Sequence, residues 1–486
     1  EWQWDGVVIS DWGAVHDTHT AIIGGLDMEF GSWTDGLTEG TSNAYDNYWL
    51  ANSYLKGIKE GIYTDKELNE KVRRVLRLTF RTAMNNDRPW GSMVSDAHKT
   101  ACRKIGEEGI VLLQNNANLL PINLSKVKRI AVIGENAIKM MTVGGGSSSL
   151  KVKYEVTPLE GLKKRIGEQA EIIYARGYVG DPTGEYNGVK TGQNLKDDRS
   201  PKELRTEALQ VASNADIVLF IGGLNKSEYQ DCEGTDRKTM DLPYNQNELI
   251  MDLLQVNKKL VVINISGTGV AMPWKNHVST ILQAWYLGSE TGNALASILM
   301  GDVNPSGKLP YTYYACLNQC GAHKLGEYPG HKGMDVLGNK VYDIPYNEGL
   351  FVGYRFIDKN KLKPNFPFGH GLSYTTFEYG KAKVNSKAIE KSEKLYITIP
   401  ITNTGNRAGA EVVQLYIKCL NSSVIRPIKE LKRFCKVELQ PNETKEISFT
   451  ITAEELSFFD EKQHKWIAEP GKFEALMASS SADIRS

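Results

Sequence analysis

The chain has 486 residues, 41% of them hydrophobic and 24% charged, which is typical of a folded globular protein of about two to four domains. Its 58 Lys and Arg residues balance its 58 Asp and Glu residues, so we expect neither nucleic acid nor an anionic membrane as a partner. No apolar run is long enough to span a bilayer. The six cysteines show no zinc-binding spacing, and two disulfides stay open: Cys316–Cys320 and Cys419–Cys435.

The chain opens with a short apolar run that ends in polar and aromatic residues. Residues 6–9 predict a short buried strand, followed by Ser10, Asp11 and Trp12. The carboxyl ends of parallel strands are where α/β proteins bind ligands. There a carboxylate can attack or stabilise an anomeric carbon, and an indole offers an apolar face to a pyranose ring. An Asp after a strand is also a common helix N-cap, so both interpretations stay open on these residues alone.

Helical and strand patterns continue to a linker at Pro89-Trp90-Gly91. A second short strand is predicted over 25–30, and helices are predicted over 15–24, 43–61 and 65–85. Thr64 and Asp65 form the expected cap of the last helix. Two successive βα units fit the last part of a (β/α)8-type barrel, so we predict such a barrel segment with linker helices over residues 1–92.

Apolar strands alternate with amphipathic helices in the middle of the chain. Strands are predicted over 129–134, 216–223, 260–265 and 279–285. Helices are predicted over 98–114, 158–166, 200–215, 246–257 and 291–300. This alternation predicts an α/β sandwich domain over residues 93–375, with a mostly parallel sheet between helices.

The residue pattern changes from about residue 395, where apolar and polar residues alternate and no long helix is predicted. Strands are predicted over 395–402, 411–418, 430–439, 446–452 and 471–478. Turn sequences separate them. We therefore predict a third domain over residues 376–486, a β-sandwich of immunoglobulin or fibronectin III type.

An acidic loop follows the predicted strand over 216–223. Four carboxylates crowd it: Glu228, Asp231, Glu233 and Asp236. Crowding raises carboxyl pKa values, and a carboxyl that stays protonated near neutral pH is what a glycosidase needs as its general acid. The alternative is a solvated acidic loop whose carboxylates pair with Lys226, Arg237 and Lys238.

A glycine-rich run, residues 144–149, lies after the predicted strand over 129–134. It has no Lys-Ser/Thr ending and no G-x-G-x-x-G in a strand-turn-helix context, which disfavours a nucleotide site. Backbone approach to a sugar hydroxyl, or plain loop flexibility, fits better. His16 and His19 are the only histidines at a metal-like spacing, and we interpret both as solvent or core residues. We expect no cofactor and no metal.

The segment Val7-Val8-Ile9-Ser10-Asp11-Trp12 resembles the nucleophile motif of glycoside hydrolase family 3. Similar segments follow in order along essentially the whole chain, at residues 108–115, 133–137, 301–310, 367–374, 403–405 and 427–431. The last two resemble the fibronectin III-like domain of that family. So many ordered motifs make chance similarity very improbable.

The resemblance implies a nucleophile at Asp11 and an acid/base at Glu233, with Glu228 as the nearest competitor for the second role. It implies substrate binding by Trp12, Ser147 and Ser148. The implied activity is that of a retaining, exo-acting β-glucosidase, with β-glucosides or cello-oligosaccharides as substrates and a secreted or periplasmic location. A β-xylosidase, an exo-glucanase or a noncatalytic carbohydrate-binding remnant are the alternatives.

The chain departs from this family at its start. Family members begin with a complete barrel, whereas only two βα units are predicted here. We therefore expect the N-terminal barrel segment to be a separate chain, and we expect Asp11 to be competent only when that segment is supplied.

Overall fold

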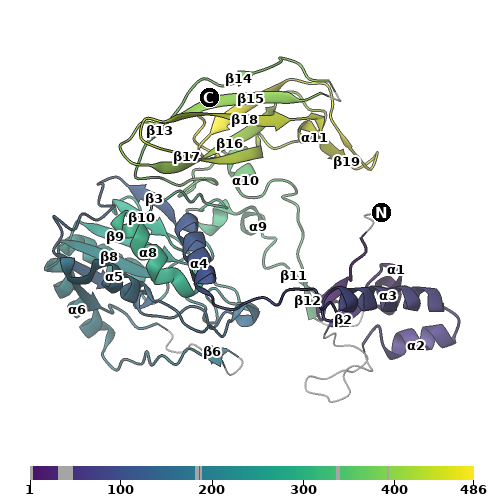
Figure 1. The fold of residues 1–486 in the computed structure, drawn as a ribbon, viewed down its shortest axis with the longest axis horizontal. Coiled ribbons are helices and arrows are strands. Elements are labelled where there is room, and N and C mark those ends of the chain that lie inside the picture. Colours follow the sequence, from purple (N-terminus) through teal and green to yellow (C-terminus); the bar gives the residue numbers. More distant parts are fainter. Residues whose placement is uncertain (1–3, 31–47, 181–184, 187–188, 335–339, 391–392) are drawn as a thin grey trace. The chain divides into compact units, whose positions relative to one another are not determined.

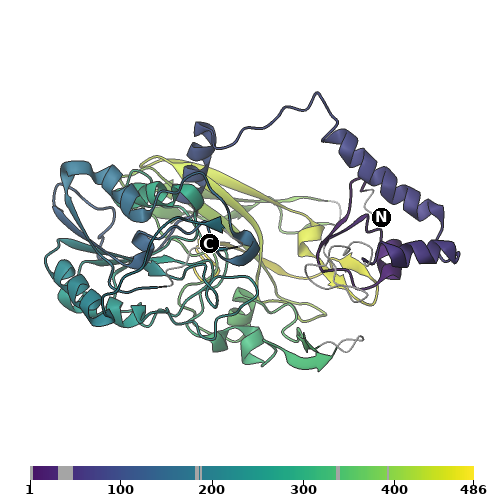
Figure 2. The ribbon, with the colours of Figure 1, turned by 90° about the horizontal axis from the view of Figure 1, so that it is seen from below.

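The computed structural model describes residues 4–30, 48–180, 185–186, 189–334, 340–390 and 393–486 (Figures 1 and 2). The chain divides into two compact units, Glu1–Met93 and Val94–Ser486. Among the helices of these described residues, none is both long and apolar enough to cross a membrane.

The first unit contains a β-α-β arrangement followed by two helices. Its elements are β1 (Ile9–Trp12), α1 (Thr18–Ile23), β2 (Met28–Phe30), α2 (Asn52–Lys59) and α3 (Asp65–Arg81). The two strands are parallel, with Ile9 opposite Met28 and Trp12 opposite Phe30. Residues 43–47 of the helix predicted over 43–61 lie outside the described residues.

The first strand is displaced from its prediction. It begins at Ile9, where its pairing with β2 begins, so Asp11 lies within β1 and not after it. Val8 and Ile9 are also exposed, at 41% each, where a buried strand was predicted. An apolar run predicts a strand, but the partner strand decides where the ladder begins, and residues 6–9 alone carry no sign of that partner.

The cap of α3 is confirmed. Thr64 accepts a hydrogen bond from the Lys66 backbone N–H, and the Glu67 carboxylate accepts one from the Thr64 backbone N–H at 3.1 Å. These bonds satisfy amides that have no partner in the first helical turn. Lys71 is buried between α3 and the β-α-β arrangement, where its Nζ donates to the carbonyl oxygens of Leu26 and Ile22. Burial lowers the pKa of Lys71.

The second unit begins with a six-stranded sheet, ordered β3-β10-β9-β8-β4-β5. Every neighbouring pair is parallel except β3 and β10, so the predicted mostly parallel sheet is confirmed. Its strands are β3 (Val111–Asn115), β4 (Arg129–Ile133), β5 (Glu171–Ala175), β8 (Ile217–Gly223), β9 (Leu260–Ile265) and β10 (Thr280–Gln283).

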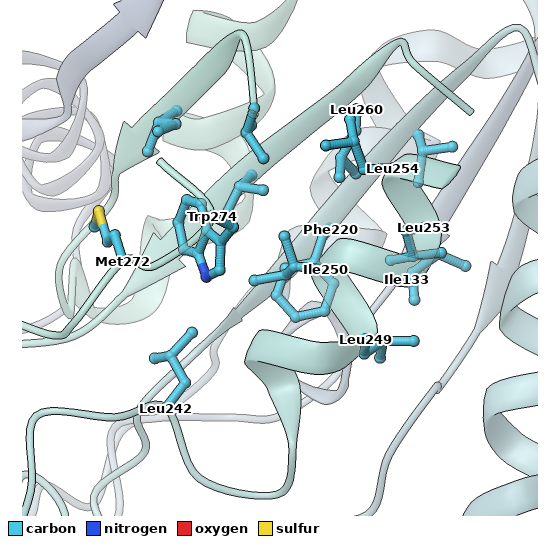
Figure 3. Packing of buried hydrophobic residues seen from close by; sticks show 14 of the residues in the cluster. Ile133, Phe220, Leu242, Leu249, Ile250, Leu253, Leu254, Leu260, Met272 and Trp274 are labelled. Carbon is cyan, nitrogen blue, oxygen red and sulfur yellow. The ribbon is translucent and has the colours of Figure 1, made fainter. Parts of the chain in front are cut away.

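Helices cover both faces of this sheet. They are α4 (Asp96–Gly109), α5 (Pro158–Ile166), α6 (Pro201–Ser213), α7 (Gln246–Val256) and α8 (Thr291–Met300). Alternate residues of β8 belong to opposite cores: Phe220 packs in the cluster that includes α7, and Leu219 packs in the cluster that includes α5 and α8. Figure 3 shows the first cluster, with Ile250 and Leu253 of α7 and Trp274. Figure 1 shows α5 and α8 side by side over the other face.

The prediction of a helix over 98–114 is wrong for residues 110–114. Helix α4 ends at Gly109, Ile110 has extended backbone angles (φ −60°, ψ 131°), and the next residues form β3. Residues 110–113 are all 1% exposed or less. A short apolar run that is buried all round fits a helix or a sheet strand equally well, and its pairing with β10 decides for the strand.

The C-terminal part is the predicted β-sandwich. One sheet pairs β15 (Leu395–Asn403) with β18 (Thr444–Ile451), β13 (Phe377–Tyr379) and β14 (Lys383–Val384). The other has the order β17-β16-β21, with bounds Glu430–Leu439, Gly409–Cys419 and Phe473–Ala478. Alternate residues such as Ile397, Ile399 and Val413 fill the core. All six cysteines lie in described residues and are free, so neither disulfide is formed.

Short elements complete the fold. They are β6 (Glu185–Tyr186), β7 (Val189–Lys190), α9 (Gly321–Lys324), β11 (His331–Met334), β12 (Lys340–Asp343), α10 (Tyr354–Lys359), α11 (Ala453–Leu456), β19 (Phe458–Asp460) and β20 (Lys465–Ile467).

We expect Gly161→Ala to destabilise the second unit by about 1–3 kcal/mol, because α5 and α8 touch through glycine backbone. A Cβ at residue 161 would lie 2.1 Å from the Gly292 carbonyl oxygen. Urea unfolding followed by circular dichroism measures the effect. Gly109→Ala is the matched control, since a Cβ there meets nothing within 4 Å. Equal midpoints for the two variants would contradict this packing.

Candidate active-site loops

Five strands of the sheet are parallel, so the loops that follow their carboxyl ends leave the sheet at the same edge. Four of these loops concern the candidate site. They are residues 134–157 after β4, 224–245 after β8, 266–279 after β9 and 284–290 after β10. The glycine-rich run lies in the first loop and the acidic residues lie in the second. The sheet therefore brings together two segments whose residues Ser147 and Glu233 are 86 positions apart in the chain.

The structure brings Glu233 and Ser147 into direct contact. The Ser147 backbone N–H donates to Glu233 Oε2 at 2.7 Å, and the Ser147 hydroxyl donates to the same oxygen. The Glu233 backbone N–H in turn points to the Gly145 carbonyl oxygen at 3.4 Å. Both Glu233 and Ser147 remain exposed to solvent. The carboxylate is thus oriented by the glycine-rich loop and open on its other side.

The glycines of this loop allow the close approach. Gly146 has a φ of +81°, and a Cβ there would lie 2.5 Å from the Glu233 Cβ. A residue with a side chain would be both strained and sterically blocked. The acidic loop is also tied back to this loop by Lys226, whose carbonyl oxygen accepts from the Gly145 N–H at 2.7 Å and whose Nζ donates to the Ser148 carbonyl oxygen at 3.3 Å.

The sequence analysis expected crowding to raise the pKa of Glu233, and the structure does not bear this out. The hydroxyl and backbone N–H of Ser147 stabilise the ionised carboxylate and lower its pKa, against a small opposing effect of burial. The prediction was wrong because no neighbouring carboxylate contributes to the pKa shift of Glu233, and two of them, Asp231 and Asp236, bind partners elsewhere.

Asp231 and Asp236 bind outside the loop. Asp231 accepts hydrogen bonds from the Gly267 backbone N–H and the Tyr286 hydroxyl, both at 2.8 Å. Asp236 accepts one from the Tyr328 hydroxyl, which raises the pKa of that phenol. Ion pairs of this loop with Lys226, Arg237 and Lys238, the alternative left open by the sequence, are not formed within the described residues.

Glu228, the competing acid/base candidate, is exposed in the same loop. Within the described part of the chain its carboxylate makes no hydrogen bond or ion pair. Ser148 is close by, but its hydroxyl donates to the Gly145 carbonyl oxygen at 3.1 Å and not to a carboxylate.

Asp11 and Trp12 lie in the first unit. Asp11 Oδ1 accepts a hydrogen bond from the Trp12 backbone N–H at 2.7 Å. Trp12 is 75% exposed, and its ring stacks on that of Phe30, with ring centroids 5.4 Å apart and planes 26° apart. The stacking leaves much of the indole surface free for an apolar ligand face.

Comparisons with known proteins match two parts of the second unit. A family model described as "Glycosyl hydrolase family 3 C-terminal domain" matches residues 110–374, and a "Fibronectin type III-like domain" matches residues 411–481. The chain belongs to glycosyl hydrolase family 3.

Named relatives extend this finding. The chain is 48% identical to "Beta-glucosidase BoGH3A" of Bacteroides ovatus and 33% identical to "Periplasmic beta-glucosidase" of Salmonella typhimurium, in each case over its whole length. It covers 64% and 63% of those two proteins. Its structure is similar to that of the family 3 β-glucosidase of Bifidobacterium adolescentis, with a TM-score of 0.82 at 31% identity, over 100% of this chain and 64% of the other. The chain thus spans a little under two thirds of these relatives.

Sequence reasoning missed the contacts of Asp231, Tyr286 and Lys226. It placed Asp231 and Lys226 in a crowded loop and gave Tyr286 no role. One signal was present: loops that follow neighbouring parallel strands meet at one edge, so polar residues just beyond β8, β9 and β10 were candidates to touch one another.

We expect Ser147→Ala to raise the pKa of Glu233, because the ionised form loses its hydroxyl donor and keeps only the backbone N–H. Carboxyl ¹³C titration of the glutamate-labelled chain measures the shift, and the Glu233→Gln spectrum assigns the resonance. Ser148→Ala is the matched control, since that hydroxyl binds Gly145. If both variants titrate as the parent chain does, the Ser147 hydroxyl does not bind Glu233.

Proposed function

We propose that this chain acts as a retaining, exo-acting β-glucosidase that hydrolyses terminal nonreducing β-D-glucosyl residues of β-glucosides or cello-oligosaccharides. The observation that carries the proposal is the carboxylate of Glu233, oriented by Ser147 at the carboxyl edge of the sheet and open to solvent. Membership of glycosyl hydrolase family 3 and 48% identity to a β-glucosidase support it.

In the proposed reaction Asp11 is the nucleophile. Its ionised carboxylate attacks the anomeric carbon while protonated Glu233 donates a proton to the leaving oxygen. Water then attacks the glycosyl-enzyme, Glu233 takes a proton from that water, and the Asp11 carboxylate leaves. Retention by this route requires a carboxyl separation of about 5–5.5 Å in the closed site. Trp12 offers its exposed ring to the apolar face of the sugar.

Ser147 has a specific place in this scheme. Its two donors favour the ionised form of Glu233, which is the form that serves as base in the second step. The first step needs the protonated form. A sugar bound over the exposed side of Glu233 removes water from the carboxylate, which opposes ionisation and favours the acid. Ser147 and Ser148 are further proposed to bind sugar hydroxyls.

The domain limits form part of the proposal: a barrel segment over residues 1–92, the α/β sandwich over 93–375 and the fibronectin III-like domain over 376–486. We propose that the remaining barrel strands come from an N-terminal segment of the kind that the family has, and that the enzyme is secreted or periplasmic. The Salmonella relative, whose printed name is "Periplasmic beta-glucosidase", supports the location.

The test uses the chain combined with such a barrel segment and a panel of aryl β-glycosides. We expect Asp11→Ala to lower kcat for an activated aryl glucoside by about 10⁴-fold or more. Glu233→Ala should lower kcat/KM for a phenyl glucoside by about 10²–10⁴-fold, because proton donation is lost. Azide, a nucleophile that needs no base, should partly restore turnover of an activated glucoside by Glu233→Ala.

Glu228→Ala is the matched control, since it removes an exposed carboxylate from the same loop. Rescue by azide in Glu228→Ala alone would transfer the acid/base role to that residue. Faster hydrolysis of the xyloside would favour a β-xylosidase. Preference for long glucans would favour an exo-glucanase. Sugar binding without any turnover would make the chain a noncatalytic carbohydrate-binding protein.

A further inference from the structure

Asp231 lies two residues before Glu233 and binds two other loops at once. Its Oδ2 accepts from the Gly267 backbone N–H and the Tyr286 hydroxyl, each at 2.8 Å, and its Oδ1 accepts from the Thr268 hydroxyl at 2.5 Å. Three donors to one carboxylate, from the loops after β9 and β10, make a charge-assisted anchor for the acidic loop.

The backbone just before the donor Tyr286 is strained. The residue before it, Trp285, has a φ of +43°, a left-handed conformation that is strained for a bulky residue. The Trp285 indole N–H donates to the Gly109 carbonyl oxygen at 2.8 Å, and its ring packs edge-on against Tyr311. Strain of this kind persists only where the surroundings enforce it, so the phenol is directed at Asp231 by its neighbours.

The acidic loop is anchored again on the far side of Glu233. Arg237 donates from Nη2 to the Gly269 carbonyl oxygen at 2.6 Å and to the Thr268 hydroxyl at 3.1 Å. The segment from 231 to 237 therefore has both ends bound to residues 267–269. Glu233 lies between these two anchors and is exposed itself.

We propose that Asp231 is a positioning residue for the acid/base Glu233, acting through its bonds to Gly267, Thr268 and Tyr286. The inference rests on the proposed function. Ser147 orients one oxygen of Glu233 and Gly145 accepts from its backbone N–H, whereas Asp231 and Arg237 hold the two ends of the segment that carries it. A general acid works only within hydrogen-bond reach of the leaving oxygen, so a loose backbone removes proton donation and leaves other steps in place.

The first experiment is hydrogen exchange of the full chain, measured by mass spectrometry. Asp231→Asn replaces one of the two accepting oxygens by an NH₂ group, which donates and cannot accept from Gly267, Thr268 or Tyr286. We expect the amides of residues 231–237 and Gly267 to exchange about tenfold faster than in the parent chain. Tyr286→Phe removes a single donor and should give a smaller change in the same peptides. Asp241→Asn is the matched control, an exposed carboxylate in the same loop that has no bond to residues 267–269.

The second experiment compares leaving groups in the active preparation. The dinitrophenolate group of a dinitrophenyl glucoside leaves without protonation, whereas the phenolate group of a phenyl glucoside must be protonated by the general acid. We expect Asp231→Asn to lower kcat/KM for the phenyl glucoside by about 10–100-fold and for the dinitrophenyl glucoside by less than about threefold. The alkaline limb of the pH profile should move, because Glu233 is no longer held against Ser147. A merely structural role of Asp231 would lower kcat/KM equally for both substrates.

The two experiments separate the inference from the proposed function. Unchanged exchange in Asp231→Asn, or equal losses on both glucosides, overturns the positioning role while the β-glucosidase proposal stands. An inactive parent preparation overturns the proposed function, and hydrogen exchange then still decides whether Asp231 holds the loop. Faster exchange with a loss confined to the phenyl glucoside supports both.

Discussion

Strand β8 is buried along its whole length, and this double-sided burial is the constraint on which the candidate site depends. Its side chains alternate between two separate hydrophobic clusters, one under α7 and one under α5 and α8. A slip of one residue would exchange the two sets and bury neither correctly. The register of β8 against β4 and β9 is therefore fixed, and with it the position at which each following loop leaves the sheet.

The loops themselves are held by polar contacts. Glu233 is bound by Ser147, Asp231 by Gly267 and Tyr286, and Lys226 by the glycine-rich loop. Such bonds are directional, so they set the orientation of a side chain more sharply than apolar packing does. They also decide the charge state: the donors of Ser147 lower the pKa of Glu233 even though other carboxylates share its loop.

Much of the fold follows from patterns of short range. Strands β4, β8, β9 and β10 and helices α5 to α8 lie where apolar periodicity predicts them, because a parallel sheet covered on both faces needs continuous apolar strands and one-sided helices. The edge strand β5 and the short strands β6 and β7 were not predicted. The same signal fails at residues 110–113, which are buried on all sides and pair with β10. It also misplaces β1, because the start of a strand depends on its partner.

The sequence by itself determined the order of the α/β part and the β-sandwich, the family resemblance and the presence of a carboxylate in a loop after β8, since local composition and short motifs indicate each of these. The tertiary structure decided which side chains meet there. Ser147 reaches Glu233, and Tyr286 reaches Asp231, only because four parallel strands deliver their loops to one edge. Contacts between residues so far apart in the chain leave no trace in local pattern, and hydrogen-bond geometry alone assigns each carboxylate its partner.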